Sequence, residues 1–200
     1  MKIHPSIKRF VDILSALPGI GPRQAIRLAF YSVGRGPSFQ KELADAIADL
    51  QKIGLCKQCF YIQTSGNGLC EFCGSDARDQ GTILIVEKET DVMSVEDVGS
   101  FNGRYLVLGD VRKNGILETD QKLRLKSLKS WIEKEQGGKA KEIIIGINPT
   151  TEGDILAGII AEEMKPFAKK VTRLGRGIPT GGEIEFADKD TLKSAIQGRS

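Results

Sequence analysis

Four cysteines are the residues of this chain whose types and spacing point most clearly to chemistry. They form two Cys-x-x-Cys pairs, Cys56 with Cys59 and Cys70 with Cys73, separated by ten residues. Each pair can present two thiolates to one ion, and residues 64–68 (Thr-Ser-Gly-Asn-Gly) predict a turn that folds the pairs together. We therefore expect a tetrahedral structural Zn²⁺ site, because four thiolates leave no open position for catalysis.

Disulfides and a redox pair are the alternatives to zinc. Residues 1–5 contain no apolar signal region, and no apolar run is long enough to span a bilayer. This predicts a cytoplasmic protein without a membrane partner, in which thiols stay reduced and disulfides are disfavoured. A redox pair needs a single Cys-x-x-Cys, whereas this chain has two. Zinc would hold together a segment that is too small to form its own core.

Carboxylates at the ends of two predicted buried strands form a second candidate site. The apolar run 143–147 is followed by a turn and then by Glu152 and Asp154, and the apolar run 83–86 ends in Glu87. Open parallel sheets bind ligands and metals at the carboxyl ends of their strands, so the three carboxylates could converge there. Carboxylate oxygens suit Mg²⁺. Because Thr150 is not acidic, we expect any such ion to be held weakly.

The N-terminal region carries a candidate nucleic-acid contact. Apolar periodicity predicts helices over residues 5–17 and 23–33, joined by Pro-Gly-Ile-Gly. This arrangement resembles a helix-hairpin-helix, a non-specific DNA-binding motif. Gly19 and Gly21 would let a backbone approach closely, while Arg23 and Arg27 lie four apart near a helix N-terminus that can bind phosphate. The competing interpretation is a plain helical hairpin whose arginines are solvated.

The remaining pattern divides the chain into four parts. A third helix, capped by Ser38 and closed by Gly54, completes an N-terminal region over residues 1–54, and the cysteines occupy residues 55–80. Strands and helices alternate over residues 81–175, which predicts a parallel sheet with helices on both faces. Residues 176–200 form a Gly-rich loop and a terminal helix, for which we expect a subunit contact. The expected strands are 83–86, 104–108, 142–147 and 171–174, and the expected helices are 91–98, 121–135, 154–164 and 188–196.

Composition excludes several classes of function. The net charge of +3 and a pI near 8.6 permit nucleic-acid binding without requiring it. The single histidine, His4, lies near the chain terminus, which nearly excludes Ser-His-Asp and Cys-His mechanisms. The segment Gly175-Arg-Gly-Ile-Pro does not match the phosphate-binding loop of nucleotide hydrolases.

Together these motifs resemble a known family. Glu87 after one strand and Thr-Glu-Gly-Asp after another are similar to the Toprim fold of topoisomerases, primases and some nucleases. The hairpin, the four cysteines, this Toprim-like part and the tail segment 172–188 follow one another as in the bacterial RecR recombination mediators. The resemblance covers nearly the whole chain. Two departures are the loop 110–120, which lacks a proline, and Asp154, where the family more often has Glu.

The resemblance implies a DNA-repair protein without catalysis of its own. Such proteins form tetrameric rings that clamp DNA and, with RecO and RecF, load RecA onto gapped or single-stranded DNA. The resemblance places Arg23 and Arg27 on DNA, and makes the acidic set vestigial or partner-facing. Two rivals remain: a Mg²⁺-dependent Toprim nuclease or primase-like enzyme, and a scaffold whose zinc and hairpin only assemble subunits. Salt-dependent DNA affinity separates the scaffold from the mediator.

Overall fold

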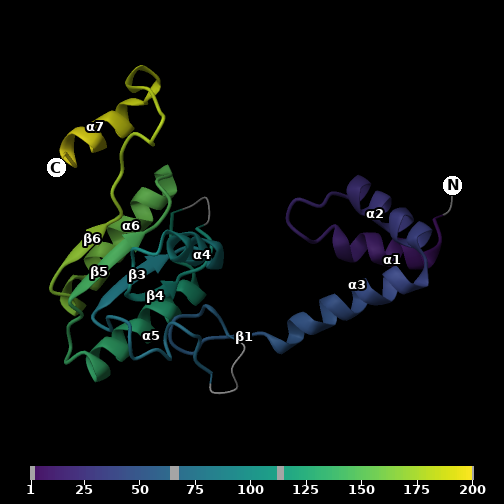
Figure 1. The fold of residues 1–200 in the computed structure, drawn as a ribbon, viewed down its shortest axis with the longest axis horizontal. Helices are drawn as coiled ribbons and strands as arrows, with labels where there is room; N and C mark the ends of the chain where they lie inside the picture. Colours follow the sequence, from purple (N-terminus) through teal and green to yellow (C-terminus); the bar gives the residue numbers. More distant parts are fainter. Residues whose placement is uncertain (1–2, 64–67, 112–114, 200) are drawn as a thin grey trace. The chain divides into compact units, whose positions relative to one another are not determined.

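The computed structural model describes residues 3–63, 68–111 and 115–199, and it divides into two compact units, 1–53 and 54–200. Figure 1 shows the order of the elements along the chain. Residues 64–67 of the predicted turn and residues 112–114 of the predicted loop at 110–120 lie outside the described residues. No helix among the described residues is long and apolar enough to cross a membrane.

Three helices make up the first unit: α1 (Pro5–Leu14), α2 (Pro22–Arg35) and α3 (Pro37–Asp49). The helix expected to reach residue 17 ends at Leu14, where the turn that contains Gly19 at a φ of +78° begins. Ser38 is not the cap of α3, because Gly36 ends α2 and begins α3 at a φ of +86°. The buried side chains of α2 are small, namely Ala25, Ala29 and Ser32.

Two short segments follow α3 that the apolar pattern did not predict. A 3-10 turn (Leu50–Lys52) succeeds the helix, and Gly54 opens strand β1 (Gly54–Leu55) instead of closing α3. Strand β1 pairs antiparallel with β2 (Ile62–Gln63). This small ribbon precedes and follows the first Cys-x-x-Cys pair.

A four-stranded parallel sheet forms the centre of the second unit, as predicted. Its strands are β3 (Thr82–Val86), β4 (Arg104–Val107), β5 (Glu142–Gly146) and β6 (Val171–Arg173), in the order β4-β3-β5-β6. The registers pair Val86 with Val107 on one side and with Gly146 on the other. The carboxyl ends of β3 and β5 are therefore neighbours, as the acidic-site hypothesis requires.

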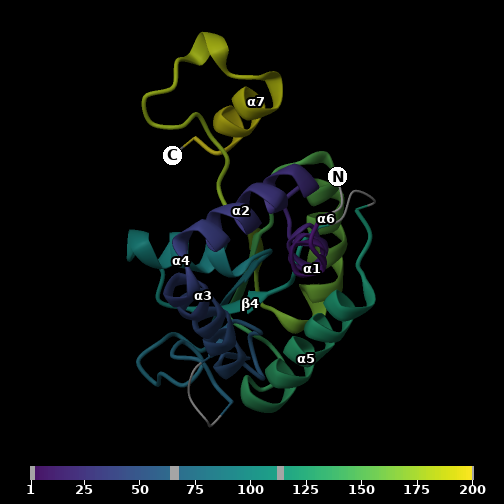
Figure 2. The same cartoon turned by 90° about the vertical axis from the view of Figure 1, so that its right-hand side faces the viewer.

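Helices cover both faces of this sheet, which gives three layers (Figures 1 and 2). Helices α5 (Thr119–Glu135) and α6 (Thr151–Met164) pack Leu125, Ile132, Leu156 and Ile160 against one face. Helix α4 (Glu89–Val98) packs on the other face through Val92. Each of these helices begins a few residues before its predicted start, because its first turn consists of polar residues that the apolar pattern does not mark.

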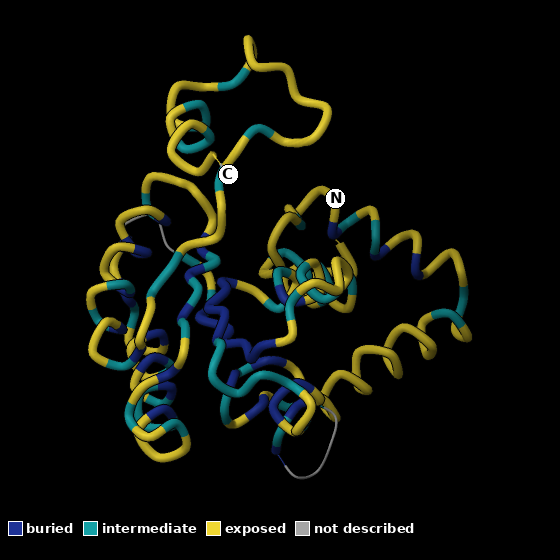
Figure 3. Tube along the Cα trace, turned by 60° about the vertical axis from the view of Figure 1, so that its left-hand side comes forward, coloured by how far each residue is buried: buried dark blue, intermediate teal, exposed yellow. Residues whose placement is uncertain are grey.

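The C-terminal segment contributes little to the core. After β6 the chain forms a 3-10 turn (Ile184–Phe186) and helix α7 (Lys189–Gln197), whose N-cap is Asp188. No described residue after Ala168 is buried, and the tail is drawn largely as exposed in Figure 3. Ile184 and Phe186 are 69% and 79% exposed, so this segment presents apolar side chains to its surroundings.

Candidate metal centre and nucleic-acid interface

The four cysteines come together in one buried cluster. Cys56 and Cys59 are at most 1% exposed, Cys70 and Cys73 at most 6%. All four sulfur atoms lie within 4.8 Å of one another, and the Sγ atoms of Cys59 and Cys70 are 3.3 Å apart. All four are free thiols, so no disulfide competes for them. Four converging sulfurs fit a tetrahedral metal ion with metal–sulfur distances of about 2.3 Å.

Backbone turns hold each cysteine pair in place. The Phe60 N–H donates to the Cys56 carbonyl at 3.0 Å, and the Gly74 N–H donates to the Cys70 carbonyl at 2.9 Å. Hydrogen bonds from the other three thiols lower the pKa of the Cys56 thiol, while donation to Cys56 raises the pKa of Cys59. Because the thiolate is the form that binds metal, four thiols that share hydrogen bonds in one cluster suit a metal site.

The part of the chain that carries the four cysteines, here called the cysteine segment (the described residues of 56–73), packs onto the sheet and shares its core. The tilted rings of Tyr61 and Phe72 pack against each other beside the cluster, and Phe72 contacts Tyr105 of β4 with ring centroids 5.2 Å apart. The Val107 N–H donates to the Cys59 carbonyl at 2.8 Å, which satisfies a donor on the edge strand β4. The four-cysteine cluster therefore covers part of the same face of the sheet as α4, where a helix would otherwise be expected.

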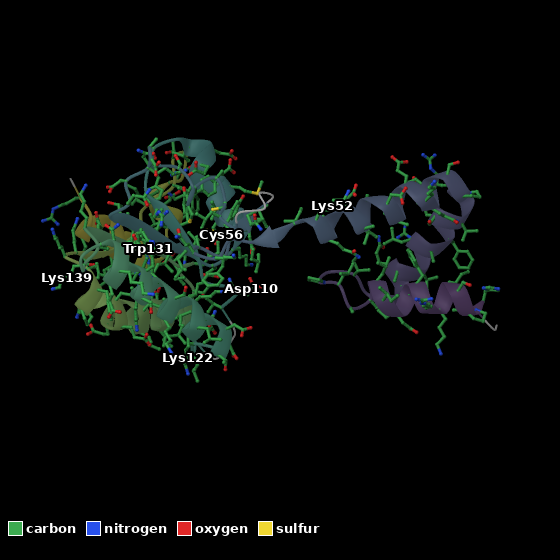
Figure 4. All side chains as sticks on the ribbon, turned by 90° about the horizontal axis from the view of Figure 1, so that it is seen from below. Lys52, Cys56, Asp110, Lys122, Trp131 and Lys139 are labelled. Carbon is green, nitrogen blue, oxygen red and sulfur yellow. The ribbon has the colours of Figure 1, made fainter. Side chains whose placement is uncertain are left out.

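Arg104 ties the cysteine segment to the other face of the sheet. This residue is 6% exposed, and its guanidinium donates to the Cys73 carbonyl at 2.6 Å and to Gln58 Oε1 at 2.9 Å. The guanidinium also stacks 4.5 Å from the ring centroid of Trp131, on α5. Cys56 and Trp131 are labelled in Figure 4. No sequence motif distinguishes Arg104, because its role depends on contacts with residues 31 and 46 positions away.

A second polar network was also absent from the sequence predictions. Arg78 donates to both carboxylate oxygens of Glu96 on α4 and to the carbonyls of Phe101 and Gly103. Tyr105 donates its hydroxyl to the same carboxylate. Burial raises the pKa of Glu96, but the hydrogen bonds from Arg78 and Tyr105 outweigh it, so the pKa is lowered overall. This network fastens the segment after Cys73 to the sheet.

Two of the three predicted acidic residues, Glu87 and Asp154, have structural partners. Buried Glu87, at the end of β3, accepts the Asn148 N–H at 2.6 Å and so fixes the turn after β5. Thr150 is the N-cap of α6, and its hydroxyl accepts the Gly153 N–H at 3.0 Å. Within the described residues, the four cysteines are the one group of three or more His, Cys, Asp or Glu side chains placed so that they could hold a metal ion. Glu87, Glu152 and Asp154 do not form another.

Two arginines neutralise Asp154 in the first turn of α6. Arg176 forks onto both of its carboxylate oxygens, and Arg173 donates to Oδ1 at 2.9 Å. These partners, together with the helix N-terminus, hold the carboxylate in its ionised form. The hydrogen bonds from Arg176 contribute most, and the pKa of Asp154 falls to about 2. The carboxylate therefore joins the start of the tail to α6.

The hairpin places its two arginines on open surface. Gly21 supplies no capping side chain to α2, and Pro22 has no N–H, so the amides of Arg23 and Gln24 lack intrahelical acceptors. Arg23 and Arg27 are both exposed and form no ion pair with any described residue. A Cβ at Gly19 or Gly21 would meet nothing within 4 Å, so the surface beside the turn is open. This arrangement can receive a phosphate.

The fold and the two sites define a class of protein: a helix-hairpin-helix followed by a four-cysteine element and a Toprim-type parallel sheet. Family profiles match in the same order. The profile for the RecR helix-hairpin-helix covers residues 7–50, the Toprim domain covers residues 81–175, and the RecR C-terminal region covers residues 177–200.

Curated relatives extend this match to the full length. The chain is 36% identical to "Recombination protein RecR" of Chloroflexus aggregans, with 100% of this chain and 98% of that protein aligned. It is 39% identical to the proteins of the same name from Chloroflexus aurantiacus and Geobacter sulfurreducens, each over 98% of this chain and at least 95% of the relative. The chain belongs to the RecR family of recombination proteins.

Proposed function

We propose that this protein is a non-catalytic DNA-repair factor that clamps DNA and, with RecO and RecF, helps to load RecA onto gapped or single-stranded DNA in the cytoplasm. The observation that carries this proposal is the hairpin of a RecR-family chain. Its free helix N-terminus and two exposed, unpaired arginines form a phosphate grip that carries no base-reading geometry. The DNA-contacting residues are then Gly19, Gly21, Arg23 and Arg27.

The distribution of charge supports DNA contact in the first unit. Residues 1–53 hold eight Lys and Arg against four Asp and Glu, whereas residues 54–200 hold 21 against 22. The excess positive charge of the chain therefore lies with the hairpin. One unit offers few phosphate contacts, so several copies in a ring would raise the affinity through their effective concentration.

Exposed apolar residues support self-association, for which we propose a homotetramer. A groove of about 350 Å³ in the first unit is lined by Ile7, Phe10, Val33, Leu43 and Ile47 among others. The tail presents Ile184, Phe186 and Ile196. Residues 1–54 and 176–200 would then supply subunit contacts, while residues 55–80 and 81–175 form the zinc element and the Toprim domain.

We propose that the metal is Zn²⁺ and that its role is structural. Cys56, Cys59, Cys70 and Cys73 would hold it, and a fully thiolate shell leaves no site for substrate. Two of the acidic residues support the absence of catalysis because they stabilise the fold: Glu87 accepts a backbone N–H and Asp154 accepts hydrogen bonds from two arginines. An engaged Asp154 is a poor Mg²⁺ ligand, which leaves Glu87, Glu152 and Asp154 as a vestigial or partner-facing set.

One experiment tests both the clamp and the absence of catalysis. End-labelled gapped DNA is incubated with the purified zinc-loaded protein and Mg²⁺ or Mn²⁺, then analysed on native and denaturing gels. We expect retarded, intact DNA, and loss of retardation in the double variant Arg23→Glu/Arg27→Glu with zinc content and oligomer size unchanged. Cleaved or extended DNA that is lost on Glu152→Gln would instead establish a Toprim enzyme. Unchanged affinity of the arginine variant would refute the hairpin as the DNA grip.

A further inference from the structure

The exposed side of α2 carries a longer basic and aromatic row than the hairpin motif accounts for. Arg23, Arg27, Tyr31 and Arg35 follow one another at intervals of four residues, and all four are exposed. At 100° per residue, Arg23, Arg27 and Tyr31 lie at least about 100° around the helix from buried Ala25, Ala29 and Ser32, and Arg35 lies about 60° from Ser32. We call these four residues the α2 row. It continues the hairpin arginines along a helix of 14 residues.

Tyr31 is held ready for stacking within this row. Tyr31 is 57% exposed, yet the orientation of its ring is fixed by an edge-on contact with Phe39 of α3, with ring centroids 5.9 Å apart. The Arg35 guanidinium lies 5.9 Å from the Tyr31 ring and 5.7 Å from the Phe39 ring. The Phe39 ring, perpendicular to Tyr31, and the Arg35 guanidinium thus hold the Tyr31 ring in one orientation, which reduces the ordering cost of binding.

A recess beside this ring provides space for a ligand. Its volume is about 440 Å³, and it is lined by Gln24, Ile26, Arg27, Leu28, Phe30 and Tyr31. The wall of the recess is mostly apolar and includes the exposed rings of Phe30 and Tyr31. Arg27 also lines the recess. A sulfate-like anion would gain nothing from such a wall, whereas a nucleobase attached to a phosphate would contact both the rings and the arginine.

We propose that the α2 row is a binding site for single-stranded DNA, in which Tyr31 stacks with an unpaired base while Arg23, Arg27 and Arg35 bind successive phosphates. A basic track with an aromatic platform is the usual means of binding single strands without reading sequence. Duplex DNA keeps its bases stacked inside, so it can use the arginines but not the ring. The site therefore favours single-stranded over duplex DNA. This inference rests on the proposed function of the hairpin.

The test compares full-length, zinc-loaded variants on two probes: a fluorescein-labelled oligothymidylate and a mixed-sequence duplex of equal length. Tyr31→Ala should weaken oligothymidylate binding by roughly five- to 100-fold, the range for loss of one stacked base, and change duplex affinity less than about twofold. Tyr31→Phe is the matched control and should bind as the wild type does. Arg35→Gln should lower the salt slope on the single strand by about 0.7.

A spectroscopic signal separates stacking from a purely structural role. In the variant Tyr31→Trp, oligothymidylate should quench the fluorescence of the new indole, whereas the duplex should not. The native Trp131 in the second unit contributes a constant background fluorescence. Unchanged single-strand affinity of Tyr31→Ala would overturn the proposal. An equal loss of affinity of Tyr31→Ala for both probes would also overturn the proposal, because it would show that the ring serves the packing of α2 against α3. A changed oligomer size would instead assign this face to a second copy of the chain.

The proposed DNA grip and this inference fail in different ways. If Arg23→Glu/Arg27→Glu loses duplex binding while Tyr31→Ala keeps its affinity for both probes, the hairpin is supported as the DNA contact and the stacking site is refuted. If the wild-type protein binds neither probe, both are refuted.

Discussion

At the scale of residues, the acidic positions show that a carboxylate predicted to bind a metal ion can instead stabilise the fold. Asp154 is one of the acidic positions that the sequence predicts for a Toprim-type site, but Arg173 and Arg176 supply the positive charge that a metal ion would otherwise provide. Glu87 is equally engaged, by a backbone N–H. The spacing of acidic residues in the sequence therefore indicates their location and not their chemistry.

The lowered pKa of Asp154 gives a prediction about pH. Its folded pKa is about 2, against an ordinary value of 3.8, so its contribution to stability is present above 3.8 and is lost as the pH falls toward 2. The difference in unfolding free energy between wild type and Asp154→Asn should therefore be constant from about pH 8 to 5. Urea unfolding at several pH values measures this difference. A difference that vanished between pH 7 and 5 would indicate a raised pKa, as a catalytic acid requires, and contradict the arginine clamp.

At the scale of elements, the turn into α6 depends on a glycine whose role is not visible in the apolar pattern. A Cβ on Gly153 would lie 2.1 Å from the Asn148 carbonyl oxygen and 3.1 Å from the Thr150 hydroxyl. The same turn carries the N-cap of α6 and the N–H that Glu87 binds. The backbone geometry after β5 therefore requires a residue without a side chain at this position.

Two glycine substitutions in α6 should have opposite effects. Gly153→Ala forces the turn to move and should destabilise the protein by about 3 kcal/mol, the upper part of the usual range for overpacking. Gly158→Ala is the matched control in the same helix, because its Cβ would meet nothing within 4 Å. It should stabilise the protein by about 0.5–1 kcal/mol through helix propensity. Urea unfolding measures both changes, and equal effects would contradict this account of the turn.

At the scale of the whole molecule, the metal centre and the sheet form one core instead of two domains. The four cysteines belong to the same buried cluster as Leu84, Val86, Tyr105 and Val107 of the sheet. The first unit contains its own small set of buried residues. Loss of the metal should therefore affect the two units differently.

Zinc removal tests this division. We expect one zinc per chain by elemental analysis, and structural zinc sites contribute on the order of 10 kcal/mol of binding free energy to the folded state. Chelation, or the variant Cys70→Ser, should markedly lower the unfolding temperature of residues 54–200 and raise the hydrogen exchange of β3 and β4. Amides of α2 should keep their protection, which serves as the internal control. Protection of the sheet that survived metal loss would show that the sheet core does not depend on the cysteine segment.

The sequence by itself determined the features that rest on local spacing. The two Cys-x-x-Cys pairs predicted the four-cysteine cluster, the alternation of apolar runs over residues 81–175 predicted the parallel sheet, and the Pro-Gly-Ile-Gly turn predicted the helical hairpin. Each of these patterns can be recognised from residues that are close in the chain. Helix starts were less accurate, since caps such as Gly36 and Thr150 are set by backbone conformation.

Only the tertiary structure decided which distant residues meet. The insertion of Arg104 between Cys73 and Trp131, and the clamp of Asp154 by Arg176, join residues that are 22 to 31 positions apart. Apolar periodicity reports which face of an element is buried, but not which polar side chain lies opposite it. The strand order β4-β3-β5-β6 sets those pairings, because it brings the ends of β3 and β5 together and exposes β4 at the edge to the cysteine segment.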